Sequence, residues 1–233
     1  GAGVPPRDTG SIYSILAIEW QLDQSSANGR HPLSVLICPG IHPPDLTQHF
    51  LSGLSHSTGS MPVDYLVFPS DQHPAYSTPH ILQFLRHQLS NPLYPQCEFP
   101  GIRQYPLVLV SFSAGVAGAI ATAWAWRIMG GTVKALIALD GWGVPLYGDF
   151  PIHRLSHDAF THWTSSVLGS GEESFYADPP VPHLQLWRSP HTTEGWRVQP
   201  SPVRIGAYRP PASRTRTTAA QFLRELLHRY GEL

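Results

Sequence analysis

The sequence predicts an α/β fold with a mainly parallel sheet. Short, continuous apolar runs such as Leu33–Cys38, Leu107–Val110 and Val133–Leu139 alternate along the chain with segments of helical periodicity. Continuous apolar runs are typical of strands buried on both faces, and parallel strands are joined by helical crossovers. The 24 prolines fall between these runs, where they interrupt neither strand nor helix.

In the first half of the chain, residues 1–10 are expected to form a loose tail. β-Branched and aromatic residues predict a first strand, and two buried strands follow, each with a helix after it. The strands are expected at Ser11–Leu22, Leu33–Cys38 and Asp64–Phe68, and the helices at Leu46–Leu54 and Pro79–Leu89.

The second half continues the alternation with three buried strands and three helices. The strands are expected at Leu107–Val110, Val133–Leu139 and His183–Trp187, and the helices at Ser113–Met129, Asp158–Leu168 and Thr217–Tyr230. Residues 188–215, rich in Arg and Pro, are expected to be irregular. The chemistry of such a sheet lies at the carboxyl ends of its strands.

Composition narrows the class of protein. A length of 233 residues favours a single domain over 1–233. Charged residues make up 13% of the chain and balance to a net charge of −1, which argues against a nucleic-acid partner. No apolar run reaches the roughly 18 residues of a membrane span. Two cysteines provide neither a disulfide framework nor a zinc site, and no leader pattern is visible, so a cytoplasmic location is expected.

The segment Ser111-Phe112-Ser113-Ala114-Gly115 carries the clearest chemical signal, at the junction of a predicted strand and helix. It matches the nucleophile elbow G-x-S-x-G, with Ser111 in place of the first glycine. The residues two before and two after the nucleophile must be small because the backbone crosses itself in the sharp turn. Ser113 would then present its hydroxyl at a helix N-terminus, where developing negative charge is favoured.

On this motif and its position, the chain from about Leu33 to the terminal helix resembles the α/β-hydrolase superfamily. The resemblance implies a three-layer sandwich, with residues 141–182 as a cap-like insertion after the fourth buried strand. It also implies an oxyanion hole made by the backbone amides of Ile41 and Ala114. In the loop that contains Ile41, Pro39 replaces the histidine of the family's His-Gly-x pattern.

The resemblance further implies an acid. Asp140 ends the strand that follows the elbow helix, the position used by a thioesterase-like subset of the superfamily. The next predicted strand offers no carboxylate at its end until Glu194, which favours Asp140. The alternative is that Asp140 only caps a turn.

The base is harder to assign because the family expects a histidine before the terminal helix and residues 192–227 contain none. We expect His157, which follows Asp140 on the same face of the sheet, to be the base, with His191 as the alternative. His183 is discounted because it would begin a strand, at the wrong end of the sheet. His42, beside the oxyanion loop, is a candidate for substrate contact or simply a surface residue.

These residues predict a serine hydrolase that cleaves an ester or thioester of an apolar small molecule through an acyl-enzyme on Ser113. Acyl transfer would use the same residues. No metal and no organic cofactor is required. The alternative is a non-catalytic protein of the same fold that binds a hydrophobic ligand or a protein partner. The oligomeric state is left open.

Overall fold

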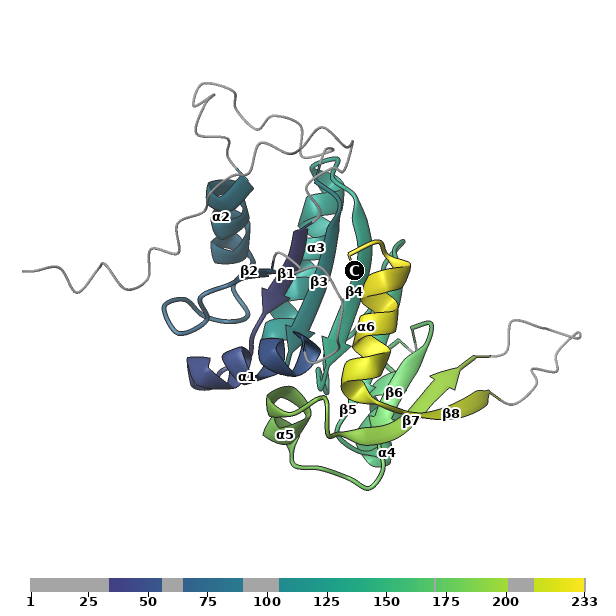
Figure 1. Ribbon diagram of the computed structural model, residues 1–233. Coiled ribbons are helices and arrows are strands. Elements are labelled where there is room, and N and C mark those ends of the chain that lie inside the picture. The colour runs from purple at the N-terminus through teal and green to yellow at the C-terminus, as the bar shows by residue number, and fades with distance from the viewer. Residues whose placement is uncertain (1–33, 56–64, 90–104, 170, 201–211, 233) are drawn as a thin grey trace, which may run out of the picture. The chain divides into compact units, whose positions relative to one another are not determined.

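The described residues form an eight-stranded sheet (Figure 1). The structure is a computed structural model that describes residues 34–55, 65–89, 105–169, 171–200 and 212–232. The strands are β1 (Ser34–Cys38), β2 (Tyr65–Val67), β3 (Leu107–Phe112), β4 (Val133–Leu139), β5 (Ile152–Ser156), β6 (Ser174–Ala177), β7 (Glu194–Gln199) and β8 (Ser213–Thr218). Their order in the sheet is β2-β1-β3-β4-β5-β6-β7-β8. Neighbours from β2 to β6 are parallel, and β7 and β8 extend the sheet in antiparallel pairing.

Six helices are described: α1 (Pro44–Ser55), α2 (Thr78–Leu89), α3 (Gly115–Ile128), α4 (Ala159–Ser166), α5 (His183–Arg188) and α6 (Ala219–Arg229). The predicted α/β class and the four strands that became β1 to β4 are confirmed, but β2, at the edge of the sheet, is half-buried rather than buried. The helices predicted after β1, β2 and β3 are confirmed as α1, α2 and α3, and the two later ones as α4 and α6. The strand predicted at Ser11–Leu22 lies outside the described residues.

Alternate residues of the central strands contribute to two hydrophobic clusters. Val35 and Ile37 of β1 belong to a cluster that also contains buried side chains of α1, α5 and α6. Leu36, between them in the sequence, belongs to a second cluster with side chains of α2 and α3. Successive strand side chains point to opposite faces, so β1 is covered on both. This explains why the central strands are apolar throughout.

The segment at residues 183–187 was expected to be a strand, and this prediction is wrong: it forms helix α5. The segment is too short for its periodicity to separate a strand from a helix. The consecutive residues Leu186 and Trp187 of this segment are both fully buried, whereas residues of a half-buried strand would alternate between buried and exposed. Pro182 sits at the N-cap position, next to where proline favours the start of a helix.

Two other regions contain strands that the apolar pattern did not indicate. β5 and β6 fall within residues 141–182, so the expected cap-like insertion is not confirmed and part of it belongs to the sheet. β7 and the first half of β8 fall within residues 188–215, which were expected to be irregular. β5 contains His153 and Arg154, both buried, and β8 is polar along its whole length.

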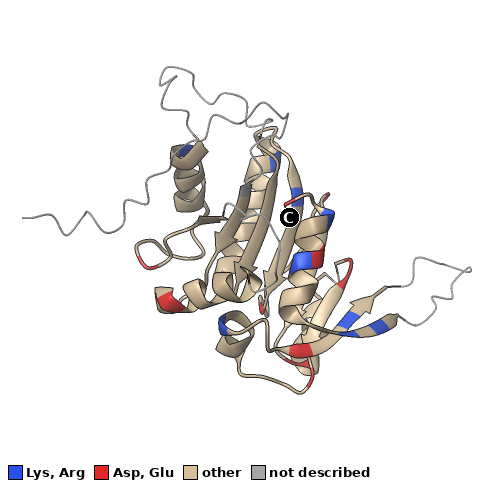
Figure 2. Cartoon of the chain, viewed as in Figure 1, with Lys and Arg blue, Asp and Glu red and all other residues tan. Residues whose placement is uncertain are grey.

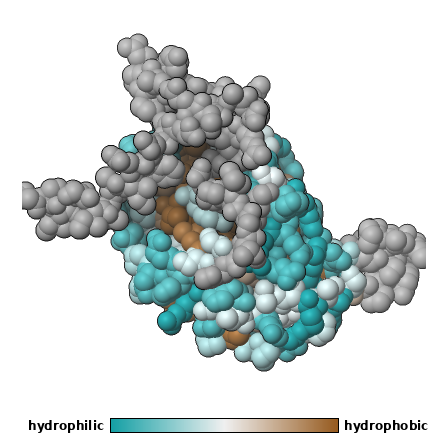
Figure 3. All heavy atoms as spheres, in the orientation of Figure 1, coloured by the Kyte–Doolittle hydropathy of each residue, from teal (hydrophilic) through white to brown (hydrophobic). Residues whose placement is uncertain are grey.

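Charged residues gather on α6, β7 and β8 (Figure 2). Arg197 on β7 donates to Glu173 at 2.8 Å and to Glu225 on α6 at 2.6 Å, which joins these elements. In the orientation of Figure 3, hydrophilic side chains cover α6, and apolar surface is visible between α1 and α2, near the β2 edge of the sheet. Among the described helices, none has the length and apolar composition needed to cross a membrane.

Candidate active site

Ser113 stands in a strained turn between β3 and α3. Its φ is 52°, in the left-handed region that non-glycine residues rarely adopt. Two hydrogen bonds hold the turn: the Ser113 N–H donates to the Leu139 carbonyl at 2.9 Å, and the Ser113 carbonyl accepts from the Val116 N–H at 3.1 Å. The strand, the single strained residue and the helix occur in the order that the elbow motif predicts.

The small residues around Ser113 are required by close backbone contacts. A Cβ on Gly115 would lie 2.3 Å from the carbonyl oxygen of Cys38 and 2.4 Å from that of Pro39. Ser111 is fully buried, and its hydroxyl donates to the Ile137 carbonyl at 3.3 Å. The loop after β1 therefore lies directly against the start of α3.

The same loop brings Gly40, which precedes the expected oxyanion donor Ile41, close to Ser113. A Cβ on Gly40, the residue before Ile41, would be 2.9 Å from the Cβ of Ser113. Among the described residues, neither the Ile41 nor the Ala114 N–H donates to a backbone carbonyl. Ile41 is 73% exposed, so hydrophobic burial of its side chain is not what holds this loop in position.

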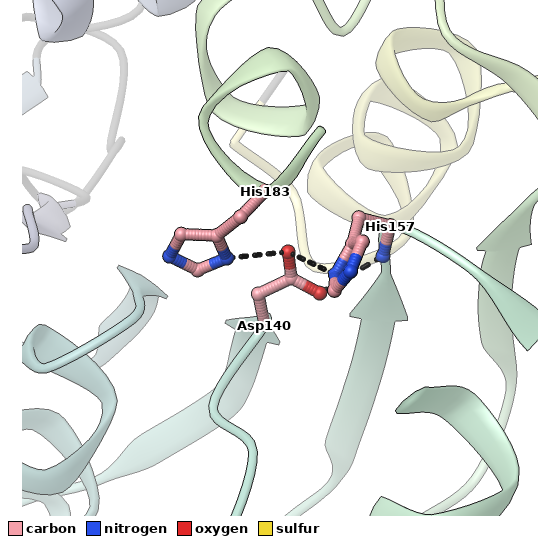
Figure 4. Close-up of side chains that lie close together, drawn as sticks. All are labelled: Asp140, His157 and His183. Atoms are coloured by element: carbon pink, nitrogen blue, oxygen red, sulfur yellow. Dashed lines mark hydrogen bonds and ion pairs between the residues drawn. The ribbon is translucent and has the colours of Figure 1, made fainter. Parts of the chain in front are cut away.

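Asp140 follows β4 directly and accepts hydrogen bonds from two imidazoles (Figure 4). Its Oδ2 lies 2.9 Å from Nδ1 of His157 and 2.9 Å from Nδ1 of His183. Its Oδ1 accepts from the backbone N–H of His157, also at 2.9 Å. Asp140 has a φ of 50° and a side chain only 1% exposed, so a strained backbone holds a buried carboxylate between the two rings.

Burial and hydrogen bonding act in opposite directions on this carboxylate. Burial alone would raise the pKa of Asp140, but the hydrogen bonds from His157 and His183 outweigh it and leave the pKa below its ordinary value. The same hydrogen bond to Asp140 raises the pKa of His157, against the effect of desolvation. The site therefore favours an ionised Asp140 at neutral pH.

The two imidazoles differ in the contacts of Nε2, the ring nitrogen that does not bind Asp140. Nε2 of His157 lies 3.3 Å from Oδ2 of Asp158. The ring of His183 stacks on Phe112, the residue before Ser113, and its Nε2 has no hydrogen bond or ion pair with a described residue. In Figure 4 this nitrogen points away from Asp140. Of the two rings, His183 has the nitrogen that is open to a further partner.

A cavity of about 480 Å³ opens beside these groups. The described residues that line it are Ser113, Ala114, Asp140, Trp142, Val144, His157, Thr161 and His183. None of these lining residues is a lysine or an arginine, so the described wall offers no permanently charged cation to an acidic substrate. Trp142 is 67% exposed although it borders this cavity. Such a wall suits an apolar group next to a small polar centre.

The structure thus brings together Ser113, Ala114, Asp140 and His157. It does not bring His191 to them: a Cβ on Gly53 of α1 would be 2.9 Å from Nδ1 of His191, so that ring lies against α1. His183, which sequence reasoning set aside, shares Asp140 with His157. The discount of His183 is corrected here, because it depended on the strand predicted at this position. Pro182 was the sequence signal that could have indicated a helix instead.

His42 lies near the site but takes no part in the Asp140 cluster. Its ring is 5.7 Å from Phe112 and 6.1 Å from Trp187, between centroids, and its Nδ1 bonds to the Pro43 carbonyl at 2.9 Å. Its Nε2 is buried without a partner among the described residues.

Neither a scan against models of protein families nor a search of curated proteins finds a match for this chain. Its function is therefore inferred from the chemistry of the site.

Proposed function

We propose that this protein is a serine hydrolase of the α/β-hydrolase type, acting on an ester or thioester of an apolar molecule. One observation carries the proposal: the strained Ser113 turn opens onto the same cavity as the Asp140 carboxylate with its two imidazoles. A serine, an imidazole and a buried carboxylate are the groups of nucleophilic acyl transfer.

The chemistry follows from these positions. The Ser113 oxygen attacks the substrate carbonyl carbon while its proton passes to Nε2 of an imidazole. The amides of Ile41 and Ala114 donate to the oxyanion of the tetrahedral intermediate. The imidazolium then gives the proton to the leaving alcohol or thiol, and an acyl ester remains on Ser113. Water, deprotonated by the same ring, releases the acid and regenerates the serine.

Two rings compete for the role of base. His157, the residue expected from the sequence, has Asp158 beside its Nε2 at 3.3 Å. His183 has an open Nε2 and a ring that is stacked against the residue next to Ser113. We therefore assign the base to His183 in this proposal, and we assign to His157 the orientation of Asp140 through two hydrogen bonds.

The proposal also includes the finer features of the fold. Helices on both sides of the sheet would make the three-layer sandwich of the superfamily. A cap smaller than residues 141–182 would consist of the segment with Trp142 and Val144 and of α4, where Thr161 lines the cavity. A single domain, a cytoplasmic location and the lack of a nucleic-acid partner, all expected from composition, remain predictions.

Labelling with a fluorophosphonate probe tests the proposal without knowledge of the substrate. The full chain should react, and peptide mapping should place the adduct on Ser113. Ser113→Ala should abolish the reaction. Ser111→Ala is the matched control, because that serine is two residues away but buried, and it should keep the labelling. An adduct on another serine, or no adduct in the wild-type protein, would contradict the proposal.

One observation favours the second candidate, a non-catalytic protein that binds a hydrophobic ligand. Among the described residues, no hydrogen bond joins the Ser113 hydroxyl to either imidazole. Catalytic hydrogen bonds are often long before substrate binds, so this geometry does not exclude the hydrolase. Quenching of the protein's tryptophan fluorescence by a fatty acid, lost in Trp142→Leu, together with an unreactive Ser113, would support binding alone.

A further inference from the structure

We infer that Asp140, His157 and His183 also form a binding site for a divalent transition-metal ion, and that an ion bound there disables the base. The first part stands on the geometry of the three side chains. The second part rests on the proposed function.

The three candidate ligand atoms are already gathered. One ligand atom from each residue lies within 4.8 Å of the others, and each Nδ1 is 2.9 Å from Oδ2 of Asp140. Imidazole nitrogens and carboxylate oxygens bind Zn²⁺ at about 2.0–2.2 Å in tetrahedral geometry, so two of its ligand atoms lie about 3.4 Å apart. The two nitrogen–oxygen separations of 2.9 Å are about 0.5 Å shorter than this, so an ion would require each imidazole to move outward from Asp140 by about that amount.

Asp140 and His157, but not His183, each have a further polar partner that orients the side chain toward the proposed ion. Nε2 of His157 faces Oδ2 of Asp158 at 3.3 Å, the carboxylate–histidine arrangement that commonly orients a metal ligand. Asp158 is itself held, because its Oδ1 accepts from the Thr161 N–H at 2.6 Å. Oδ1 of Asp140 accepts from the His157 N–H, which leaves Oδ2 as the ligand atom. A neutral His157 with an ion on Nδ1 would donate its one N–H to Asp158.

The donor set indicates the class of ion. Two imidazole nitrogens and one carboxylate oxygen suit zinc and the neighbouring first-row ions, whereas Mg²⁺ and Ca²⁺ prefer oxygen alone. The three residues line a cavity of about 480 Å³, which leaves coordination positions open to water or a ligand.

The effect on the base follows from where the imidazole carries its proton. As a base, neutral His183 keeps its proton on Nδ1, donates it to Asp140, and accepts the Ser113 proton at Nε2. An ion on Nδ1 takes that lone pair, and the ring's single proton then sits on Nε2. The ring has no lone pair left for Ser113. Metal binding and general-base catalysis therefore exclude each other at His183.

Calorimetry with Zn²⁺ on the metal-stripped full chain carrying Ser113→Ala tests the site independently of any activity. One ion per chain should bind. His183→Gln and Asp140→Asn should each weaken binding at least tenfold, and Asp158→Asn should weaken it about 10- to 100-fold by removing support from His157. The His183 side chain is 42% exposed, so its replacement is compatible with folding, which circular dichroism verifies.

The matched control is His80→Gln. Among the described residues away from the site, His73 and His80 also form a close histidine pair, with ring centroids 4.7 Å apart, and could take up zinc adventitiously. This variant should leave the affinity unchanged. Binding lost in His80→Gln but retained in His183→Gln would overturn the inference, as would no binding at 100-fold excess of Zn²⁺.

Cobalt gives a second measurement. Co²⁺ bound by the two imidazoles should show visible d–d absorption that His183→Gln loses and His80→Gln keeps; an identical spectrum in both variants would overturn the site.

Fluorophosphonate labelling of the wild-type chain then tests the metal site and its effect on the base separately. If the chain is labelled in EDTA and added Zn²⁺ suppresses the labelling, both the metal site and its effect on the base are supported. Labelling insensitive to bound Zn²⁺ overturns the exclusion at His183 and leaves the hydrolase intact. Zinc binding without labelling in EDTA removes the hydrolase and leaves the metal site.

Discussion

The imidazole ring of His183 stacks on the phenyl ring of Phe112, with centroids 4.7 Å apart and planes inclined by 22°. The other contacts continue this stack: Phe112 lies 5.0 Å from Trp187, and Trp187 lies 3.7 Å from Phe50 on α1. Phe112 is the last residue of β3 and precedes Ser113. The stack therefore fixes the position of α5, and with it the proposed base, relative to the proposed nucleophile.

Phe112→Leu should separate this positioning from general stability. The variant loses aromatic contact with His183 and should label with fluorophosphonate about tenfold more slowly, because small displacements of a catalytic group are costly. Its free energy of unfolding should fall by about 2 kcal/mol. Phe222→Leu, also fully buried in the same cluster, is the control. It should lose similar stability and keep the labelling rate; equal loss of labelling in both variants would argue against positioning by Phe112.

His183→Gln and His157→Gln should have unequal effects on the reaction of Ser113. With His183 replaced, no ring with an open nitrogen remains on Asp140, so the labelling rate should fall by several powers of ten. With His157 replaced, Asp140 keeps its hydrogen bond from His183 and the loss should be smaller, about tenfold. Labelling rates measured on both variants at pH 7.5 decide the matter. The reverse order would return the base to His157, the residue expected from the sequence.

The parts of the fold that local physics determines were predictable. β1, β3 and β4 are buried on both faces, so their sequences are mainly apolar whatever their partners. The nucleophile elbow could be recognised in the sequence because its need for small residues falls on neighbouring positions, from Ser111 to Gly115. Asp140 was predictable because it directly follows the apolar strand β4, whereas His157 was expected in a loop and instead directly follows β5, a strand that the apolar pattern did not indicate.

The rest depends on partners distant in sequence. His153 and Arg154 are polar residues inside a buried strand. Their hydrogen-bond partners include the carbonyls of Glu173, Gly169, Leu168 and Val144 and the hydroxyl of Tyr230. No local pattern indicates those partners. The place of His183 is likewise set by how α5 packs on Phe112, which a six-residue segment cannot reveal by itself.

Gly115→Ala should test the crossing of the backbone at the elbow. The added methyl would meet the carbonyl oxygens of Cys38 and Pro39 at less than van der Waals distance, so the loop or the helix must move. We expect a loss of about 3 kcal/mol in the free energy of unfolding, even though alanine favours helices.

Gly143→Ala is the comparison for that experiment. Gly143 has a φ of 79° and nothing within 4 Å of an added Cβ, so only backbone strain of about 1 kcal/mol is expected. Urea denaturation of both variants provides the measurement. A Gly115→Ala protein as stable as wild type would show that the close approach seen here is relaxed at no cost.

His153 should make the stability of the fold depend on pH. The ring is fully buried on β5, donates from Nδ1 to the Glu173 carbonyl at 3.0 Å, and accepts at Nε2 from the Tyr230 hydroxyl at 2.7 Å. Burial is the main reason that its pKa falls from 6.5 to about 4. Between these two values the unfolded chain binds the proton and the folded chain does not. This contribution to stability is therefore complete above pH 6.5 and is lost as the pH falls toward 4.

Between pH 7 and pH 5 the loss from this one residue should be roughly 2 kcal/mol in the free energy of unfolding. His153→Gln keeps a donor and an acceptor at this position but does not titrate. Urea denaturation of both proteins at the two pH values isolates the effect. His162, whose pKa is also lowered to about 4, contributes equally to both. The variant should thus lose less stability on acidification than the wild-type protein; equal losses would mean that His153 takes up its proton without cost in the folded state.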